Sequence, residues 1–290
     1  TNAFRVIHGE GDGVPGLIID YYDKNWVIQA HSTGIFLQME QIAKAIQANF
    51  SAYCETIYCK SSGTLPNTGT DYFLFGTKAE TVAKENNILF SVNWVEGQKT
   101  GFFLDQRENR KLLGEFSKGK KVLNTFCYTG GFSIYAMSAG AELVTSVDIS
   151  QKAVDLAASN MELNFPHANH KAVADDVFNF MKEHTQQYDV IVLDPPAFAK
   201  SIKSKHTATQ AYKRLNIAGL KALAPNGILF TFSCSQVIDD VLFYNTIAAA
   251  AIETGRNIRV LHKLEQGPDH PTNIYHPEGH YLKGLVLFVE

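Results

Sequence analysis

From residue 122 onward, short apolar runs typical of β-strands alternate with segments of helix length. The strand-like runs are VLNTF (122–126), LVTSVD (143–148), HKAVAD (170–175), YDVIVLD (188–194), GILFTFS (227–233), NIRVLHKL (257–264) and LKGLVLFVE (282–290). Between them, helices are expected near 131–139, 151–164, 176–184, 207–223 and 238–254. Because most of these strands are apolar throughout, the pattern predicts an α/β domain whose helices cover both faces of a mostly parallel sheet. A loop separates the last two runs, which could make one of them antiparallel.

The first 95 residues have a different pattern. β-type pieces are expected at 17–22, 26–31, 55–60 and 88–94, with a helical stretch around 36–49. We therefore expect a small α+β domain over 1–95, for which an RNA-binding role is left open, followed by an α/β domain over 96–290. A chain of 290 residues is long enough for both.

Composition excludes several classes of protein. With 45% hydrophobic and 19% charged residues, the chain is neither disordered, coiled-coil nor collagen-like. No apolar run reaches the roughly 18–20 residues that a membrane helix needs, and the first residues do not resemble a signal peptide, so a cytoplasmic protein is expected. The four cysteines are too dispersed for a disulfide framework or a zinc site, and no metal is expected.

The residues that follow the first three strands of the α/β domain suit a nucleoside cofactor. The first strand leads into Cys127-Tyr128-Thr129-Gly130-Gly131, the second ends at Asp148, and the third at Asp175-Asp176. A glycine turn before a helix brings backbone close to a ligand, and an acid at the next strand end accepts ribose hydroxyls. The alternatives are an ordinary turn and helix caps, although Ser150 is better placed than Asp148 to cap a helix from Gln151.

The fourth strand ends in Asp194-Pro195-Pro196-Ala197-Phe198. The prolines remove two N–H donors, so that carbonyls and the Asp194 carboxylate can face a substrate, and Phe198 offers a surface for stacking a nucleobase. This element favours a methyltransferase acting on a planar nitrogen heterocycle. The following segment, 200–221, contains no acid and suits phosphate binding despite the net charge of −3. A solvated helix face is the simpler explanation of its charge. Its basic residues are Lys200, Lys203, Lys205, Lys213, Arg214 and Lys221.

The fifth strand ends in Ser233-Cys234-Ser235. Cysteine is often a small buried hydrophobe. At this position it is expected to share a cavity with Asp194 and Phe198, which favours a nucleophile. A thiol is mostly protonated at neutral pH, so Cys234 needs a nearby group that lowers its pKa, for which His270 and Lys200 are candidates.

These residues resemble those of the RlmI-like bacterial 23S ribosomal RNA (cytosine-5)-methyltransferases, which are class I S-adenosylmethionine (SAM)-dependent enzymes. The resemblance covers nearly the whole chain and is carried by GEGDGVPGLIIDYY (9–22), GQKTGFFLDQRENR (97–110), VLNTFCYTGGFSIYA (122–136), SVDIS (146–150), LDPPAFAKS (193–201), FSCS (232–235) and GPDHP...YLKGL (267–285). It implies a Rossmann-like seven-stranded methyltransferase sheet, SAM as cofactor, and methylation of a 23S rRNA cytosine through a covalent Cys234 adduct.

The resemblance also implies roles for individual residues. Cys234 and Asp194 are the expected catalytic residues, and Pro196, Phe198, Lys200, Lys203 and Lys205 are expected to bind substrate. GQKTGFFLDQR would form a hairpin and helix start over the methionine end of the cofactor. A plain packing role for Phe102 and Phe103, with Arg107 in a surface ion pair, is the alternative. The expected cofactor-binding residues are Asp105, Arg107, Asn124, Phe126, Cys127, Thr129, Gly130, Asp148, Ile149, Ser150, Asp176, Val177, Asp194 and Pro195.

Some questions stay open at this point. Relatives usually carry an RNA-binding PUA domain before GEGDG, and we expect this chain to lack it. The rival functions are a purine nitrogen methyltransferase that uses the DPPAF turn without a covalent step and a non-catalytic ribosome-binding factor. A NAD-dependent oxidoreductase is disfavoured because the glycine turn lacks G-x-G-x-x-G. Ribosomal RNA is the expected partner, with no membrane partner. The oligomeric state is not determined, and a homodimer is left open.

Overall fold

A computed structural model describes residues 1–65, 70–199 and 201–290. Contacts divide the chain into two compact units. The first consists of Thr1–Arg107 and Gly267–Gly279, and the second of Glu108–Gln266 and His280–Glu290. The first unit therefore extends past the boundary expected at residue 95. It also takes in Gly267–Gly279, called here the return segment, which the sequence pattern assigned to the second domain.

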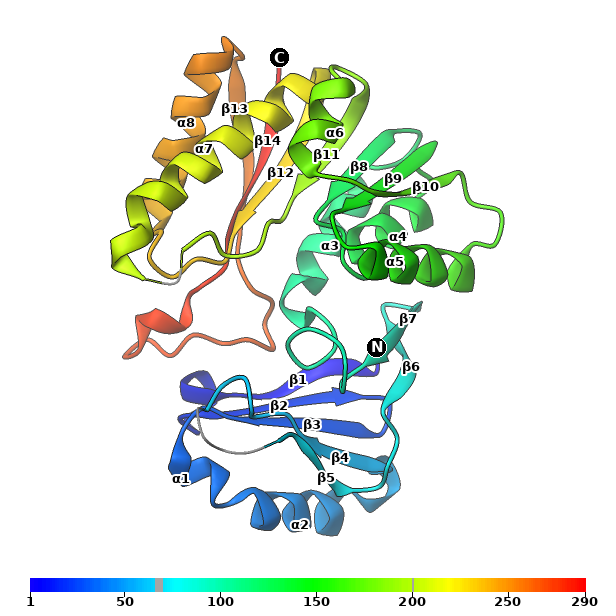
Figure 1. The fold of residues 1–290 in the computed structure, drawn as a ribbon, viewed down its shortest axis with the longest axis vertical. Coiled ribbons are helices and arrows are strands. Elements are labelled where there is room, and N and C mark those ends of the chain that lie inside the picture. The colour runs from blue at the N-terminus through cyan, green and yellow to red at the C-terminus, as the bar shows by residue number, and fades with distance from the viewer. Residues whose placement is uncertain (66–69, 200) are drawn as a thin grey trace. The chain divides into compact units, whose positions relative to one another are not determined.

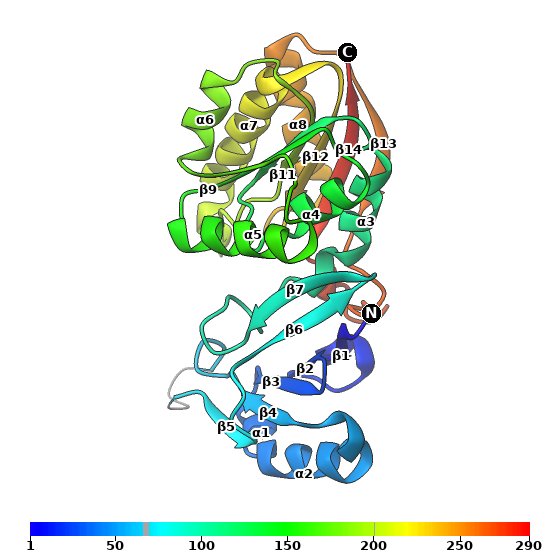
Figure 2. The same ribbon diagram turned by 90° about the vertical axis from the view of Figure 1, so that its right-hand side faces the viewer.

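The first unit is built on a mixed sheet with strand order β1-β2-β3-β4-β5, in which only β3 and β4 run parallel. Helices cover one face of this sheet, and a separate hairpin of β6 and β7 follows it (Figures 1 and 2). The core against the helices contains Ile19, Trp26, Ile28 and Met39. The elements are β1 (Ala3–His8), β2 (Leu17–Tyr22), β3 (Asn25–Ala30), α1 (Thr33–Phe36), α2 (Met39–Phe50), β4 (Thr56–Cys59), β5 (Tyr72–Phe75), β6 (Glu80–Glu85) and β7 (Ile88–Asn93).

Three strands of this unit were not expected from the sequence. They are β1, β5 and β6. In β6 (ETVAKE) the exposed and buried positions alternate, and the buried ones are Thr81, Ala83 and Glu85. Small and charged residues at the inward positions give no apolar period, and for that reason the pattern did not reveal the strand.

The second unit contains the predicted seven-stranded sheet, in the order β10-β9-β8-β11-β12-β14-β13. All neighbouring strands are parallel except β14, which is antiparallel to both β12 and β13. The strands are β8 (Lys121–Thr125), β9 (Leu143–Asp148), β10 (His170–Ala174), β11 (Tyr188–Leu193), β12 (Leu223–Ser233), β13 (Ile258–Leu264) and β14 (Lys283–Val289). The helices are α3 (Arg107–Glu115), α4 (Gly131–Ser138), α5 (Gln151–Asn164), α6 (Val177–Glu183), α7 (Lys205–Ala222) and α8 (Asp240–Thr254).

Helices cover both faces of this sheet, as the apolar strands predicted. Leu123 belongs to a core with α6, α7 and α8, whereas its neighbour Val122 belongs to a core with α3 and α4 (Figure 1). Successive residues of a strand point to opposite faces, so both must be apolar here. Helix α3 was expected only as a helix start, because RENRKLLGE is strongly charged.

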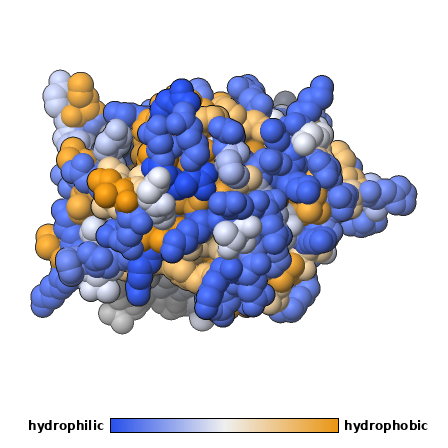
Figure 3. All heavy atoms as spheres, turned by 90° about the horizontal axis from the view of Figure 1, so that it is seen from above, coloured by the Kyte–Doolittle hydropathy of each residue, from blue (hydrophilic) through white to orange (hydrophobic). Residues whose placement is uncertain are grey.

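The parallel strands β8 to β12 end at one edge of the sheet, where the predicted site residues follow them. The antiparallel β14 ends with the chain at the opposite edge (Figure 1). Seen from above, hydrophilic side chains cover most of the visible surface, and hydrophobic ones appear in separate patches (Figure 3). Among the residues that the structure describes, no helix is both long and apolar enough to span a bilayer.

Candidate active site

The turn after β8 is tightly curved and held by hydrogen bonds. Phe126, Tyr128 and Gly130 have positive φ angles of 53°, 45° and 76°. The Gly130 N–H donates to the Cys127 carbonyl at 2.8 Å, and the Asn160 side chain donates to the Thr129 carbonyl at 3.0 Å. A Cβ on Gly130 would lie 3.0 Å from the Ala157 Cβ. Glycine is therefore required here, both by the backbone angle and by the close approach of α5.

Two other predicted cofactor residues near this turn are held inside the protein. Asn124 is 1% exposed and donates to Ser133 Oγ at 2.9 Å. Cys127 is buried, and burial raises the pKa of its thiol. Cys127 is consequently a packing residue or contact, not a reactive thiol.

The acid after β9 holds the turn after β8. Asp148 Oδ2 accepts from the Tyr128 N–H at 3.2 Å, and Oδ1 accepts from the Ser150 N–H at 3.0 Å. Ser150 caps α5 through its Oγ, as the sequence predicted, so Asp148 is not the cap. Ile149 beside it exposes 76% of its side chain. A half-buried carboxylate beside an exposed apolar residue is suited to bind a ribose and to contact an adenine.

The two acids after β10 have different roles. Asp176 caps α6, since its Oδ1 accepts from the N–H groups of Phe178 and Asn179 at 3.0 and 3.1 Å. Asp175 Oδ1 accepts from the Asp176 N–H at 2.7 Å. Val177 is buried in the core. Asp176 Oδ2 makes no hydrogen bond among the described residues, which leaves it available to a ligand.

The residues after β11 and β12 lie side by side. The two strands are parallel neighbours, with Leu193, the last residue of β11, opposite Thr231, and β12 continues two residues further to Ser233. Beyond the strands, the Ala199 N–H donates to Ser235 Oγ at 3.4 Å, and the Tyr212 hydroxyl shares a hydrogen bond with Ser235 Oγ at 3.1 Å. Ser235 therefore joins the loop that contains Asp194, Pro195 and Pro196 to the strand end that carries Cys234.

Cys234 is not fully buried. Cys234 is half-buried and packs at the margin of the α3–α4 core, while Ser233 and Ser235 on either side are buried. Lys283, the first residue of β14, is opposite Ser233 in the ladder and donates to the Ser235 carbonyl at 2.9 Å. Lys283 was not among the residues expected at this site. A single lysine at the start of an otherwise apolar strand was the available signal.

Phe198 is partly engaged with the protein. Its ring lies 4.7 Å from that of Tyr212, tilted by 53°, and it packs against the core around α7. Phe198 is only half-buried, so stacking on a nucleobase stays a prediction.

The basic residues after this loop differ in their surroundings. Lys203 is exposed on a short 3-10 turn, whereas Lys205 pairs with Asp239 at 3.4 Å. Lys213 forms an ion pair with Glu253 at 2.6 Å. Lys200 is outside the described residues. The predicted phosphate-binding segment thus has at least one cation in contact with an acid of α8 rather than with solvent alone.

The GQKTGFFLDQR segment does not form the expected hairpin. After β7 the chain makes turns until a 3-10 helix at Leu104–Gln106, and α3 then begins at Arg107 as predicted. Side-chain contacts, not the hydrogen bonds of a strand ladder, hold this segment. The Thr100 hydroxyl donates to Asp20 Oδ2 at 2.5 Å, and the ring centroids of Phe102 and Phe90 are 4.7 Å apart.

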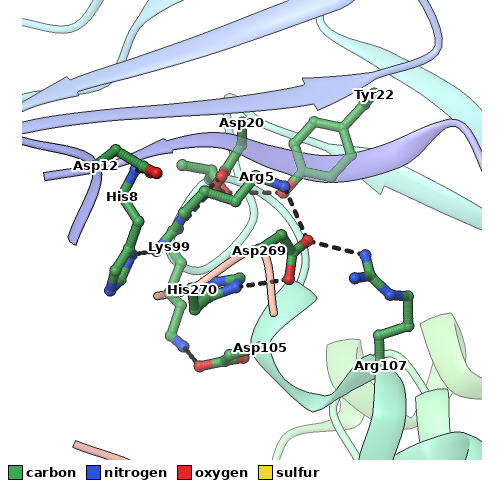
Figure 4. A network of polar contacts seen from close by, with 11 residues as sticks. Arg5, His8, Asp12, Asp20, Tyr22, Lys99, Asp105, Arg107, Asp269 and His270 are labelled. Carbon is green, nitrogen blue, oxygen red and sulfur yellow. Dashed lines mark hydrogen bonds and ion pairs between the residues drawn. The ribbon is translucent and has the colours of Figure 1, made fainter. Parts of the chain in front are cut away.

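Asp105 and Arg107 are bound by ion pairs within the first unit (Figure 4). Lys99 contacts Asp105 at 2.7 Å, and Arg107 contacts Asp269 of the return segment at 2.8 Å. Arg107 is only 9% exposed, so the surface ion pair considered above is in fact buried. Contact of these two residues with the cofactor stays a prediction.

The same polar network fixes the return segment to β1 (Figure 4). Asp269 Oδ2 also accepts from the Arg5 N–H at 3.2 Å, and its Oδ1 pairs with His270 Nδ1 at 3.0 Å. Burial alone would raise the pKa of Asp269, but hydrogen bonding from His270 and the charge of Arg107 lower it to about 2. His270, considered above as a partner of Cys234, is therefore committed to Asp269 in the first unit.

Comparison with known proteins identifies the family of this chain. A family model described as S-adenosylmethionine-dependent methyltransferase matches residues 32–285. The chain belongs to this family, and its cofactor is SAM.

One curated relative and two solved structures are similar to nearly the whole chain. The chain is 40% identical over 294 residues to ribosomal RNA large subunit methyltransferase I of Aeromonas hydrophila, covering 98% of this chain and 74% of the relative. A solved structure assigned as a SAM-dependent methyltransferase from Streptococcus mutans has a TM-score of 0.87 and 27% identity, covering 99% of this chain and 75% of that one. A methyltransferase structure complexed with SAH has a TM-score of 0.86, with the same identity and coverage.

Proposed function

We propose that this chain methylates C5 of a cytosine in the 23S RNA of the large ribosomal subunit, through a transient covalent bond to Cys234. Its relatives are named as large-subunit rRNA methyltransferases, which supports the substrate class. The observation that carries the chemistry is the hydrogen bond between the Ala199 N–H and Ser235 Oγ. It holds the acid-proline loop and the cysteine at one corner of the sheet.

The residues after β8, β9 and β10 fit SAM. The Asp148 carboxylate would accept the ribose hydroxyls, Ile149 would contact the adenine, and Asp176 Oδ2 would accept from its amino group. The turn from Phe126 to Gly130 would contact the part of SAM beyond its ribose and adenine. When bound, SAM supplies an electrophilic methyl group.

Cys234 would supply the nucleophile. C5 of cytosine is too weakly nucleophilic to be methylated directly. Attack of the Cys234 thiolate on C6 forms a C–S bond and moves the electron pair of the C5–C6 double bond to C5. Once C5 carries the methyl group, loss of its proton and departure of the thiolate restore the double bond and free the enzyme.

Asp194 would stabilise the base during attack. A hydrogen bond from a protonated Asp194 to N3 of the ring would accommodate the negative charge that develops there. Its position directly after β11, beside the Cys234 strand end, suits this role. Lys203 and its basic neighbours would hold RNA phosphates, a contact that weakens with salt.

A trapping experiment tests the covalent step. The full chain is incubated with SAM and a 23S rRNA transcript containing 5-fluorocytidine, in which fluorine replaces the proton that must leave C5. We expect an RNA–protein adduct that survives denaturation, forms with wild type and Cys54→Ala, and is absent for Cys234→Ala. Full turnover by Cys234→Ala on ordinary RNA would instead indicate methylation of a ring or exocyclic nitrogen. Mapping 5-methylcytosine in 23S rRNA with and without the gene identifies the nucleotide.

A further inference from the structure

Cys234 has a buried cation beside it. Lys283 is 3% exposed, yet it forms no ion pair with a carboxylate among the described residues. Its Nζ donates to the carbonyls of Ser235 at 2.9 Å and Tyr281 at 2.8 Å. Burying an ammonium without a counter-ion is costly, so its place in the fold needs an explanation.

Lys283 contacts the residues before and after Cys234 in the chain. Lys283 lies opposite Ser233 in the β12–β14 ladder, and its Nζ is bonded to the carbonyl of Ser235. The residue between these two contacts is Cys234. The two carbonyls accept two protons of the Lys283 ammonium, and the third has no acceptor among the described residues.

We infer that Lys283 is the positioning residue that activates Cys234, by holding its thiol as a thiolate. The inference rests on the proposed function, because a nucleophilic Cys234 is what gives the lysine its purpose. The charges of Lys283 and Cys234 interact, and a positive charge near a thiol favours its charged form and lowers its pKa. Lys283 stays an ammonium throughout, and the proton that Cys234 loses passes to solvent.

The two acids that interact with Lys283, Asp239 and Asp240, already have partners of their own. Asp239 caps α8 and pairs with Lys205, while Asp240 pairs with His280 at 3.3 Å. Both acids are more than half exposed, which screens their repulsion of a thiolate. Tyr212 is buried, and burial is the main cause that raises the pKa of its hydroxyl. Asp194 follows the neighbouring strand β11, but the acids that raise the pKa of Lys283 are Asp240 and Asp239.

The causes that shift the pKa of Lys283 include an interaction with Cys234. Burial lowers it, whereas Asp240 and Cys234 raise it. A lysine that gains from an anionic Cys234 gives the same free energy back to the thiolate, since the coupling is reciprocal. His270 or Lys200 is then not needed for this task.

The test is the pH dependence of Cys234 alkylation in the full chain, without RNA. Iodoacetamide reacts with the thiolate, and mass spectrometry of the Cys234 peptide gives the rate at each pH. We expect a wild-type midpoint below the roughly 8.5 of an ordinary thiol. Lys283→Gln, which keeps N–H donors and removes the charge, should raise the midpoint by about one pH unit or more and slow alkylation at pH 7 about tenfold.

Matched variants separate activation from structure. Lys263→Gln removes an exposed charge from neighbouring β13 and should leave the midpoint unchanged. Lys283→Arg keeps the charge and should restore a low midpoint. An unchanged midpoint in folded Lys283→Gln would overturn the proposal. If that variant does not fold, a wild-type midpoint at or above about 8.5 overturns it alone. A low midpoint with no trapped adduct would refute the covalent mechanism instead.

Discussion

At the scale of the residue, burial decides which groups can carry charge. His8 on β1 is half-buried beside Arg5, whose Nη1 lies 3.0 Å from His8 Nδ1. Burial first, and then the Arg5 charge, lower the pKa of His8 from 6.5 to about 4. The folded chain therefore keeps His8 neutral where the unfolded chain would protonate it.

This predicts acid destabilisation through His8. Below pH 6.5 the unfolded state binds a proton that the folded state does not, so the free energy of unfolding falls until pH 4. In His8→Asn, the decrease between pH 7 and pH 4 should be smaller by about 1–2 kcal/mol after allowance for partial exposure. Urea denaturation at each pH measures it. The exposed control His206→Asn should follow wild type, and an equal decrease in His8→Asn would refute the prediction.

At the scale of the element, helix starts are the places where structural and ligand-binding roles overlap. Ser150, Asp176 and Asp239 cap α5, α6 and α8 through side-chain oxygens. The sequence singled out Ser150 and Asp176 because caps and strand ends have local signatures, whereas Asp239 was not identified. It could not separate the two roles of Asp176, because one carboxylate can cap with one oxygen and bind with the other.

Two substitutions at Asp176 separate these roles. Asp176→Ala should lower the free energy of unfolding by about 1 kcal/mol, because the α6 cap is lost. Asp176→Asn keeps the cap and should stay within a few tenths of wild type. If Oδ2 binds the cofactor, both should weaken SAM binding about tenfold by calorimetry. Wild-type affinity in Asp176→Asn would limit this residue to capping.

At the scale of the whole molecule, the chain leaves the second unit after β13 and contributes the return segment to the first. The Arg107–Asp269 ion pair and the Asp269–His270 contact anchor it there. Gly11 allows the close approach, because a Cβ at this position would collide with the Pro271 carbonyl.

A single methyl group at Gly11 should therefore detach the return segment. Gly11→Ala is expected to cost about 1–3 kcal/mol by overpacking and to make Gly267–Gly279 sensitive to limited proteolysis. Gly34→Ala, whose Cβ would meet no atom within 4 Å, is the control and should be cleaved like wild type. If Gly11→Ala resists the protease equally, the anchoring is independent of this contact.

The sequence by itself determined the second unit in most of its detail. The strand ends Asp148, Asp194 and Cys234 were located correctly because buried parallel strands have a strong periodic signal and their carboxyl ends must share one edge. The strand pattern also indicated that one of the last two strands could be antiparallel, and that strand is β14.

Only the tertiary structure decided which distant residues meet. Lys283 lies opposite Ser233, next to Cys234 in the chain, because β14 pairs with β12. The return segment belongs to the first unit because Asp269 contacts Arg107, 162 positions earlier in the sequence. Such contacts depend on the order of strands and on the closure of long loops, and neither leaves a periodic trace in the residues concerned. Local sequence patterns therefore determine where strands and helices form, whereas tertiary packing determines which of them come into contact.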